Sequence, residues 1–443
     1  MHGVAGARWF FREVVEPLCD SFDPDLQHRH DELLARVIAE WARTNAEFRV
    51  QLARRLAGRD LLERRARTTG SAAWTAAAPD LCVLPSRVTI GADIAVTATI
   101  AGVVRAAWPD TRIAVAGSVS RLEPLFGGRH GMEIWEHEYP RHGTIADRLA
   151  VWLDVAGAVE TWRHEHPAAR LLVLDPDSRI TQLGLLPLAV GAAERLFPSR
   201  GTPGTDRRGL AELAAEWAAK VTGLERVSPP GDRIRPRDRD VSWSGSLAHD
   251  LRATLRRPVV FASLGVGGNP RKAATAAMES EVLAGLAAHA AVVLDSGAAA
   301  AEVERAMEVS LHWAARTGGT VRQVRVGVPS SVATGQSPEL TLLRGADLST
   351  VTALLGYADV FVGYDSACQH IAAAVGTPGV VVFVDPPSPT FVHRWCAPGM
   401  SAVVVDRASD AGCSNATDRV QRAALTELNR AFQPSGQRSR RTR

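Results

Sequence analysis

The stretch 359–384, DVFVGYDSACQHIAAAVGTPGVVVFV, contains a complete strand–loop–helix–strand pattern. A hydrophobic strand ends at Gly363, and the loop Tyr364–Cys368 leads into a helix that starts near Gln369. Three consecutive alanines let this helix lie close to a sheet, and Gly-Thr-Pro precedes the next strand, 379–384. Unpaired amides and the positive dipole end at the start of such a helix favour a phosphate group. The stretch therefore predicts parallel β-structure with an anion site after its first strand.

A glycine-rich turn upstream supplies a second candidate phosphate site. The strand 258–264 is followed by Gly265–Lys272, GVGGNPRK. Glycines let backbone amides approach a phosphate closely, and Arg or Lys neutralises its charge. A simpler interpretation stays open for each candidate site. The glycine-rich turn is then an ordinary βα turn. In the stretch 359–384, Asp365 is then only a helix N-cap and His370 a packed helix residue.

The rest of the chain repeats the strand–loop–helix rhythm. Short apolar strands are predicted at 81–84, 112–116, 170–174, 258–264, 290–294, 321–326, 359–363 and 379–384. This alternation predicts parallel sheets covered by helices on both faces, in two Rossmann-like domains that face a cleft. Before them, apolar residues at helical spacing predict a helical extension, and the final helix, about 416–432, is expected to pack back on the first domain. The predicted parts are a helical extension at 1–75, an N-terminal Rossmann-like domain with a linker at 76–250, a C-terminal Rossmann-like domain at 251–433 and a disordered basic tail at 434–443.

Composition excludes several classes of protein. The chain has 443 residues, 46% of them hydrophobic, and a net charge of +3, which does not suggest a nucleic-acid binder. Its five cysteines include no C-x-x-C pair, which fits a reducing cytosol and hence a cytoplasmic location. The sequence shows no signal peptide, no membrane span and no histidine spacing typical of a metal site. We therefore expect no metal and no cofactor.

The stretch 359–384 resembles glycosyltransferase family 9, the ADP-heptose:lipopolysaccharide heptosyltransferases. The family pattern reads approximately D-[ST]-G-x-x-H-x-A-A-A-x-G-x-P, and this chain departs from it at Ala367, where a glycine is usual. The resemblance covers about 80–405 and implies a GT-B fold, with a nucleoside-diphosphate sugar bound mainly by the C-terminal half. The donor-binding residues that it implies are Gly267, Gly268, Asn269, Arg271, Lys272, Asp365, Ser366, Ala367, Gln369 and His370.

The resemblance extends to the first βα loop, where the family has S-x-x-G-D-[VI]. Here the segment reads SRVTIGAD, from Ser86 to Asp93, with Ala92 inserted before the aspartate. The resemblance makes Asp93 the candidate catalytic base, and a helix N-cap is the simpler alternative. The acceptor-binding residues that it implies are Ser86, Arg87, Thr97, Asp175 and Asp177.

The resemblance implies metal-independent, inverting transfer of a heptose or hexose from a nucleoside-diphosphate donor to an acceptor hydroxyl or amine. The expected partners are this donor and a small-molecule or glycan acceptor. Two alternatives stay open: a nucleotide-sugar epimerase or hydrolase on the same fold, and a non-catalytic sugar-nucleotide-binding protein.

Overall fold

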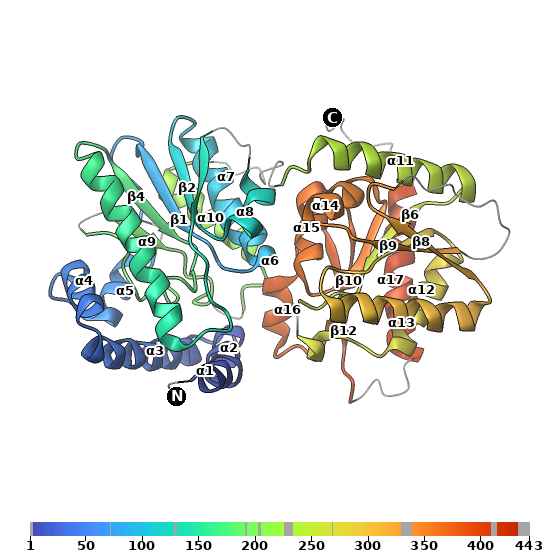
Figure 1. Cartoon of the computed structure of the whole chain (residues 1–443), viewed down its shortest axis with the longest axis horizontal. Coiled ribbons are helices and arrows are strands. Elements are labelled where there is room, and N and C mark those ends of the chain that lie inside the picture. The colour runs from blue at the N-terminus through green and yellow to red at the C-terminus, as the bar shows by residue number, and fades with distance from the viewer. Residues whose placement is uncertain are drawn as a thin grey trace. The chain divides into compact units, whose positions relative to one another are not determined.

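The computed structural model forms two compact units (Figure 1). It describes residues 3–70, 72–127, 131–190, 193–202, 205–225, 234–267, 269–328, 339–408 and 414–432. Two predictions, the donor contact of Gly268 and the disordered tail at 434–443, lie outside the described residues. Unit 1 comprises Met1–Arg235 with Pro387–Pro398, and unit 2 comprises Pro236–Pro386 with Gly399–Arg443.

Unit 1 contains a five-stranded parallel sheet with the order β3-β2-β1-β4-β5. Its strands are β1 (Leu81–Pro85), β2 (Arg112–Gly117), β3 (Met132–Glu136), β4 (Leu171–Asp175) and β5 (Ala193–Leu196). Its helical segments are α1 (Val4–Phe10), η1 (Phe11–Val15), α2 (Glu16–Asp20), α3 (Pro24–Thr44), α4 (Ala46–Leu56), α5 (Leu61–Thr68), α6 (Ile90–Ala92), η2 (Asp93–Thr97), α7 (Ala98–Ala107), α8 (Val119–Phe126), α9 (Ile145–Glu165), α10 (Leu210–Thr222) and α16 (Pro389–Trp395).

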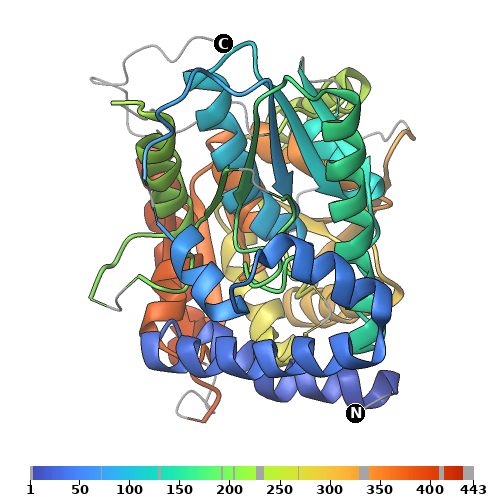
Figure 2. The ribbon, with the colours of Figure 1, turned by 90° about the vertical axis from the view of Figure 1, so that its left-hand side faces the viewer.

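The N-terminal helices, blue in Figure 2, share one hydrophobic core with the sheet of unit 1. Leu34 and Ile38 of α3 are buried on the face that the sequence pattern predicts. Phe48 of α4 is fully buried, and its ring centroid lies 4.9 Å from that of Trp152 in α9. The extension is therefore part of the core of unit 1.

Unit 2 contains a seven-stranded parallel sheet with the order β12-β11-β10-β6-β7-β9-β8. Its strands are β6 (Val259–Ser263), β7 (Ala291–Asp295), β8 (Thr320–Arg325), β9 (Glu339–Arg344), β10 (Val360–Tyr364), β11 (Gly379–Val384) and β12 (Met400–Val405). Its helical segments are α11 (Asp238–Leu255), η3 (Pro270–Lys272), α12 (Ala276–Ala287), α13 (Ala300–Thr317), α14 (Leu348–Tyr357), α15 (Ala367–Val375) and α17 (Ser414–Phe432).

The helices of unit 2 form two layers, α11 with α14 and α15, and α12 with α13 and α17 (Figure 1). Because α11 packs on α14, β6 and β7, the compact unit begins at Pro236 and not at residue 251. The prediction that the final helix returns to the first domain is wrong, since α17 packs on α12, β10 and β11. The apolar face of α17 indicates that the helix is buried on one side, but it does not indicate which unit the helix packs against.

Helix α16, in the C-terminal part of the chain, belongs to unit 1. The guanidinium group of Arg394 is buried and donates to the carbonyl oxygens of Thr202, Asp206 and Arg208, at 3.3, 2.8 and 2.6 Å. The α16 segment is thereby fixed to the loop before α10.

One stretch, Ile90–Ala107, passes a length and composition test for a membrane span. Its residues are 67% buried within the protein, and its helix α7 packs against α10. It is placed as a core helix of unit 1.

Candidate functional site

In each unit the strand order reverses beside the first strand. In unit 2, β7 lies on one side of β6 and β10 on the other, while in unit 1, β2 and β4 flank β1 in the same way. Ligands of open α/β sheets bind at the carboxyl ends of the strands at such switch points. The predicted donor and acceptor residues follow these strands.

The ends of β6 and β10 lie in close contact. Gly363 pairs with Ser263, and a Cβ atom at residue 363 would lie 2.5 Å from the carbonyl oxygen of Ser263. Glycine is therefore required at this position, because any side chain would push the strands apart. The loops that follow the two strands emerge at the same edge of the sheet.

At this edge Lys272 and Asp365 form an ion pair. The Nζ atom of Lys272 lies 2.5 Å from Oδ2 of Asp365, whose Oδ1 accepts a hydrogen bond of 2.9 Å from Gln369 Nε2. The Asp365 side chain is 10% exposed and that of Lys272 is 33% exposed. The structure thus brings three predicted donor residues together, although Lys272 lies 93 positions before Asp365 in the sequence.

The start of α15 lies next to this ion pair. Ser366 is the N-cap residue but makes no side-chain capping bond, and its buried Oγ has no hydrogen-bond partner among the described residues. Ala367 is the first residue of α15, and His370, buried within its first turns, is 6% exposed. Asp365 precedes the N-cap, so the simpler N-cap reading does not describe it.

The glycine-rich turn ends in the short helix η3. Gly267 has φ +60°, a conformation that favours glycine, and Asn269 Oδ1 accepts a hydrogen bond from the amide of Arg271 at 3.2 Å. The carbonyl oxygen of Arg271 accepts a 2.6 Å bond from Arg407, which also pairs with Asp385. Arg407 is a basic neighbour that sequence reasoning missed, because it follows β12 and only the sheet order brings it here.

In unit 1 the predicted base, Asp93, is enclosed. It is 1% exposed, and its carboxylate accepts bonds of 2.7 to 2.8 Å from the Ser86 hydroxyl, the Arg87 amide and the Thr97 hydroxyl. Desolvation by burial raises the pKa of Asp93, although these hydrogen bonds oppose the shift. Asp93 begins η2, so it holds the loop after β1 to this helix.

The other predicted acceptor residues also meet at this edge, but with partners inside the protein. Arg87 donates a 2.6 Å bond to the carbonyl oxygen of Pro176. Asp177, 2% exposed, binds Ser199 and the guanidinium of Arg200, and Asp175 accepts from Thr181 at 2.6 Å. In this structure these side chains hold the loops together, and their acceptor contacts stay a prediction.

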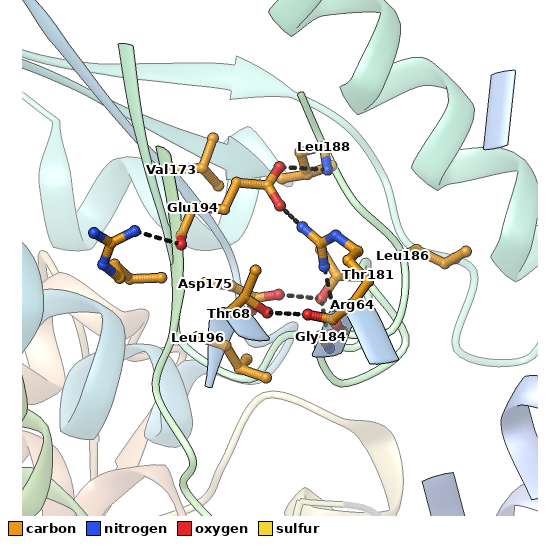
Figure 3. A pocket seen from close by; sticks show the side chains of 11 residues that line it. Arg64, Thr68, Val173, Asp175, Thr181, Gly184, Leu186, Leu188, Glu194 and Leu196 are labelled. Atoms are coloured by element: carbon orange, nitrogen blue, oxygen red, sulfur yellow. Dashed lines mark hydrogen bonds and ion pairs between the residues drawn. The ribbon is translucent and has the colours of Figure 1, made fainter. Parts of the chain in front are cut away.

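Behind this edge the extension places an arginine inside unit 1 (Figure 3). Arg64 of α5 contacts Glu194, whose Oε1 accepts from the amides of Leu188 and Ala189. The cavity that Arg64, Leu188 and Glu194 line together with Asp175 has a volume of about 10 Å³. This is room for about one water molecule and not for a substrate.

A comparison with protein families matches part of the C-terminal half of the chain. Residues 280–422 match the model of glycosyltransferase family 9 (heptosyltransferase). The resemblance to glycosyltransferase family 9 is confirmed. By this match the chain is a glycosyltransferase of the heptosyltransferase-like type. The matched segment runs from α12 into α17, so it includes Asp365 and His370 but neither Lys272 nor Asp93.

A comparison with solved structures supports the fold. The glycosyltransferase family 9 protein from Veillonella parvula matches 79% of this chain and 97% of its own, with 13% identity and a TM-score of 0.53. The ADP-heptose lps heptosyltransferase II of E. coli matches 79% and 98%, with 15% identity and a TM-score of 0.49. The predicted two-domain α/β fold of the GT-B type is confirmed. No curated protein matches the chain.

Proposed function

We propose that this glycosyltransferase moves a heptose or hexose from a nucleoside diphosphate to an acceptor hydroxyl or amine, with the donor bound by unit 2. The observation that carries the proposal is the Lys272–Asp365 pair at the switch point, beside the start of α15. A cation, a buried hydroxyl and helix amides at one edge suit a diphosphate. ADP-heptose is the first donor to test, because the family resemblance implies it and the family model that matches residues 280–422 is that of the heptosyltransferases.

The chemistry of the donor follows from these groups. When the acceptor oxygen or nitrogen bonds to the anomeric carbon, the bond from that carbon to the diphosphate breaks, and negative charge develops on the leaving group. Lys272, the Ser366 hydroxyl and the amides of α15 would stabilise that charge. Arg271 would add a second cation, while Asp365, Gln369 and His370 would orient the sugar or the phosphates. Asn269 and Gly267 shape the turn that carries the two basic residues.

We propose metal-independent transfer with inversion of the anomeric centre. Positive side chains can neutralise a leaving diphosphate in place of a metal ion. In the part of the chain that the structure describes, no group of three or more His, Cys, Asp or Glu side chains is placed to hold a metal. Transfer that persists in excess chelator would support this, and loss of transfer restored by a divalent cation would refute it.

We assign the general base to Asp93, as the family resemblance implies. For this role the loop after β1 must release one carboxylate oxygen, since Ser86, Arg87 and Thr97 of unit 1 donate hydrogen bonds to the Asp93 carboxylate. Val88 in this loop has φ +73°, which costs a β-branched residue about 1–3 kcal/mol and favours a rearrangement. Asp93→Asn should lower the rate of transfer by about 100-fold or more. Near-wild-type turnover would remove Asp93 from the base role.

Isothermal titration of the purified chain with ADP tests donor binding. The chain has only two lysines, so Lys272→Ala has a natural control in Lys220→Ala, whose side chain is exposed and pairs with Glu216 in unit 1. We expect Lys272→Ala to weaken ADP binding about tenfold or more, and Lys220→Ala to bind like the wild type. Equal ADP affinity in all three proteins would refute the proposed site.

Product analysis separates the alternatives. Release of free sugar or of an isomerised donor without acceptor would favour a hydrolase or an epimerase, and donor binding without turnover would favour a binding protein. We further propose a cytoplasmic location, because the described cysteines Cys19, Cys82 and Cys368 carry free thiols.

A further inference from the structure

A buried hydrogen-bond network lies directly behind the Lys272–Asp365 pair. The hydroxyl of Tyr364 donates a 2.6 Å bond to Oε1 of Glu279, which is 3% exposed. Oε2 of Glu279 lies 2.8 Å from Arg305, which pairs also with Glu308 at 3.1 Å. Tyr364 and Glu279 line one largely apolar cavity with Met278 and Val382. Burying a carboxylate in apolar surroundings costs free energy of desolvation, so its hydrogen bonds to the two donors are needed to hold it there.

The network holds both segments that carry the ion pair. The Tyr364 hydroxyl accepts a 2.9 Å bond from the amide of Ala274, and Arg305 donates a 2.8 Å bond to the Ala274 carbonyl oxygen. The peptide groups of Ala274, two residues after Lys272, are thus fixed at both the amide and the carbonyl. Tyr364 itself directly precedes Asp365. One phenol hydroxyl therefore connects the segment of Lys272 to the strand end that positions Asp365.

We propose that Tyr364 and Glu279 are positioning residues, which set the Lys272 ammonium group against Asp365 for binding of the donor diphosphate. This inference rests on the proposed function, because it assigns the pair to the donor site. Neither residue belongs to the set that the sequence pointed to. Their effect passes through Ala274 and Asp365, so neither needs to touch the donor.

The charge on Glu279 gives the network a pH signature. Desolvation by burial raises the pKa of Glu279 to about 7, opposed by the bonds from Tyr364 and Arg305 and assisted by the nearby Glu308. The carboxylate is ionised above that pH, where it holds both donors most strongly. Protonation at lower pH weakens the bond to Arg305, and the Ala274 segment is held less firmly.

Nuclear magnetic resonance of lysine labelled at its ε-carbon tests the inference without any ligand. The two lysines give two signals, and Lys272→Ala identifies one of them. We expect the Lys272 signal to shift in Tyr364→Phe and Glu279→Gln but not in Tyr357→Phe, which changes a tyrosine that is 37% exposed on α14. In the wild type the Lys272 signal should change as the pH passes about 7, and this change should vanish in Glu279→Gln.

A Lys272 signal unchanged in both variants would overturn the inference and leave these residues a role in stability alone. A pH response that persists in Glu279→Gln would also overturn it, since the response would then belong to another group. If Tyr364→Phe does not fold, Glu279→Gln, which keeps the shape of the side chain, still decides between these outcomes.

Titration with ADP over the same variants separates this inference from the proposed function. We expect Tyr364→Phe to weaken ADP binding by about tenfold, because it leaves the Ala274 amide without its partner. ADP binding that needs Lys272 but is unaffected in Tyr364→Phe and Glu279→Gln would overturn the inference alone. If the wild-type chain shows the predicted lysine signals but does not bind ADP, the proposed donor site is refuted. The effect of Tyr364 and Glu279 on the position of Lys272 then still stands.

Discussion

Replacing Phe48 by alanine should destabilise unit 1 strongly, although Phe48 belongs to the N-terminal extension. Its ring is fully buried and lies 4.9 Å from Trp152 and 4.3 Å from Trp41, measured between ring centroids. Removing a buried phenylalanine costs about 3–5 kcal/mol, because apolar contacts are lost and a cavity remains. In a unit of this size that loss lowers Tm by roughly 6 °C or more.

Urea unfolding followed by tryptophan fluorescence measures this effect. Val50→Ala is the matched control, because Val50 lies on the same helix and is 62% exposed. We expect the control to stay within about 0.5 kcal/mol of the wild type. If Phe48→Ala is as stable as Val50→Ala, the extension is a separately folded or loosely attached element, and the reasoning from the shared core is refuted.

Other predictions concern buried charges in unit 1. Burial raises the pKa of Asp175 to about 6, above its unfolded value of about 4, so the protein should lose up to about 3 kcal/mol of stability as the pH rises between these values. Asp175→Asn should flatten that dependence in urea unfolding at pH 4 and pH 6.5, approximately the two limits, and an unchanged slope would contradict the assignment. Arg394→Met should cost about 3 kcal/mol or more, because three carbonyl oxygens lose their donor. A thermal unfolding curve that matches the wild type would show that α16 is held by other contacts.

Much of the fold could be predicted from the sequence, because its signals are local. The valine-rich strand β11 is buried on every residue, and α15 follows β10 as the small-residue pattern indicates. In parallel sheets covered on both faces, strands appear as continuous apolar runs bounded by polar loops. The switch points then place the predicted loops of each unit at one edge of its sheet.

The remaining features depend on contacts between distant parts of the chain. The sequence indicated Lys272 and Asp365 separately, but the 2.5 Å distance between them follows from the pairing of β6 with β10. Glu279 appears in the sequence as an ordinary helix residue, and its role depends on Tyr364, which lies 85 positions away. The simpler reading of Asp93 as an N-cap missed its place inside η2. The apolar or acidic character of a residue does not show which distant residue it will contact.

The most direct test of the account is an experimentally determined structure of the protein with bound ADP. The account predicts that the diphosphate lies at the carboxyl edge of β6 and β10, with the Lys272 ammonium group and the first amides of α15 as its partners. A diphosphate bound at any other edge of the sheet, or held without Lys272, would contradict the central claim.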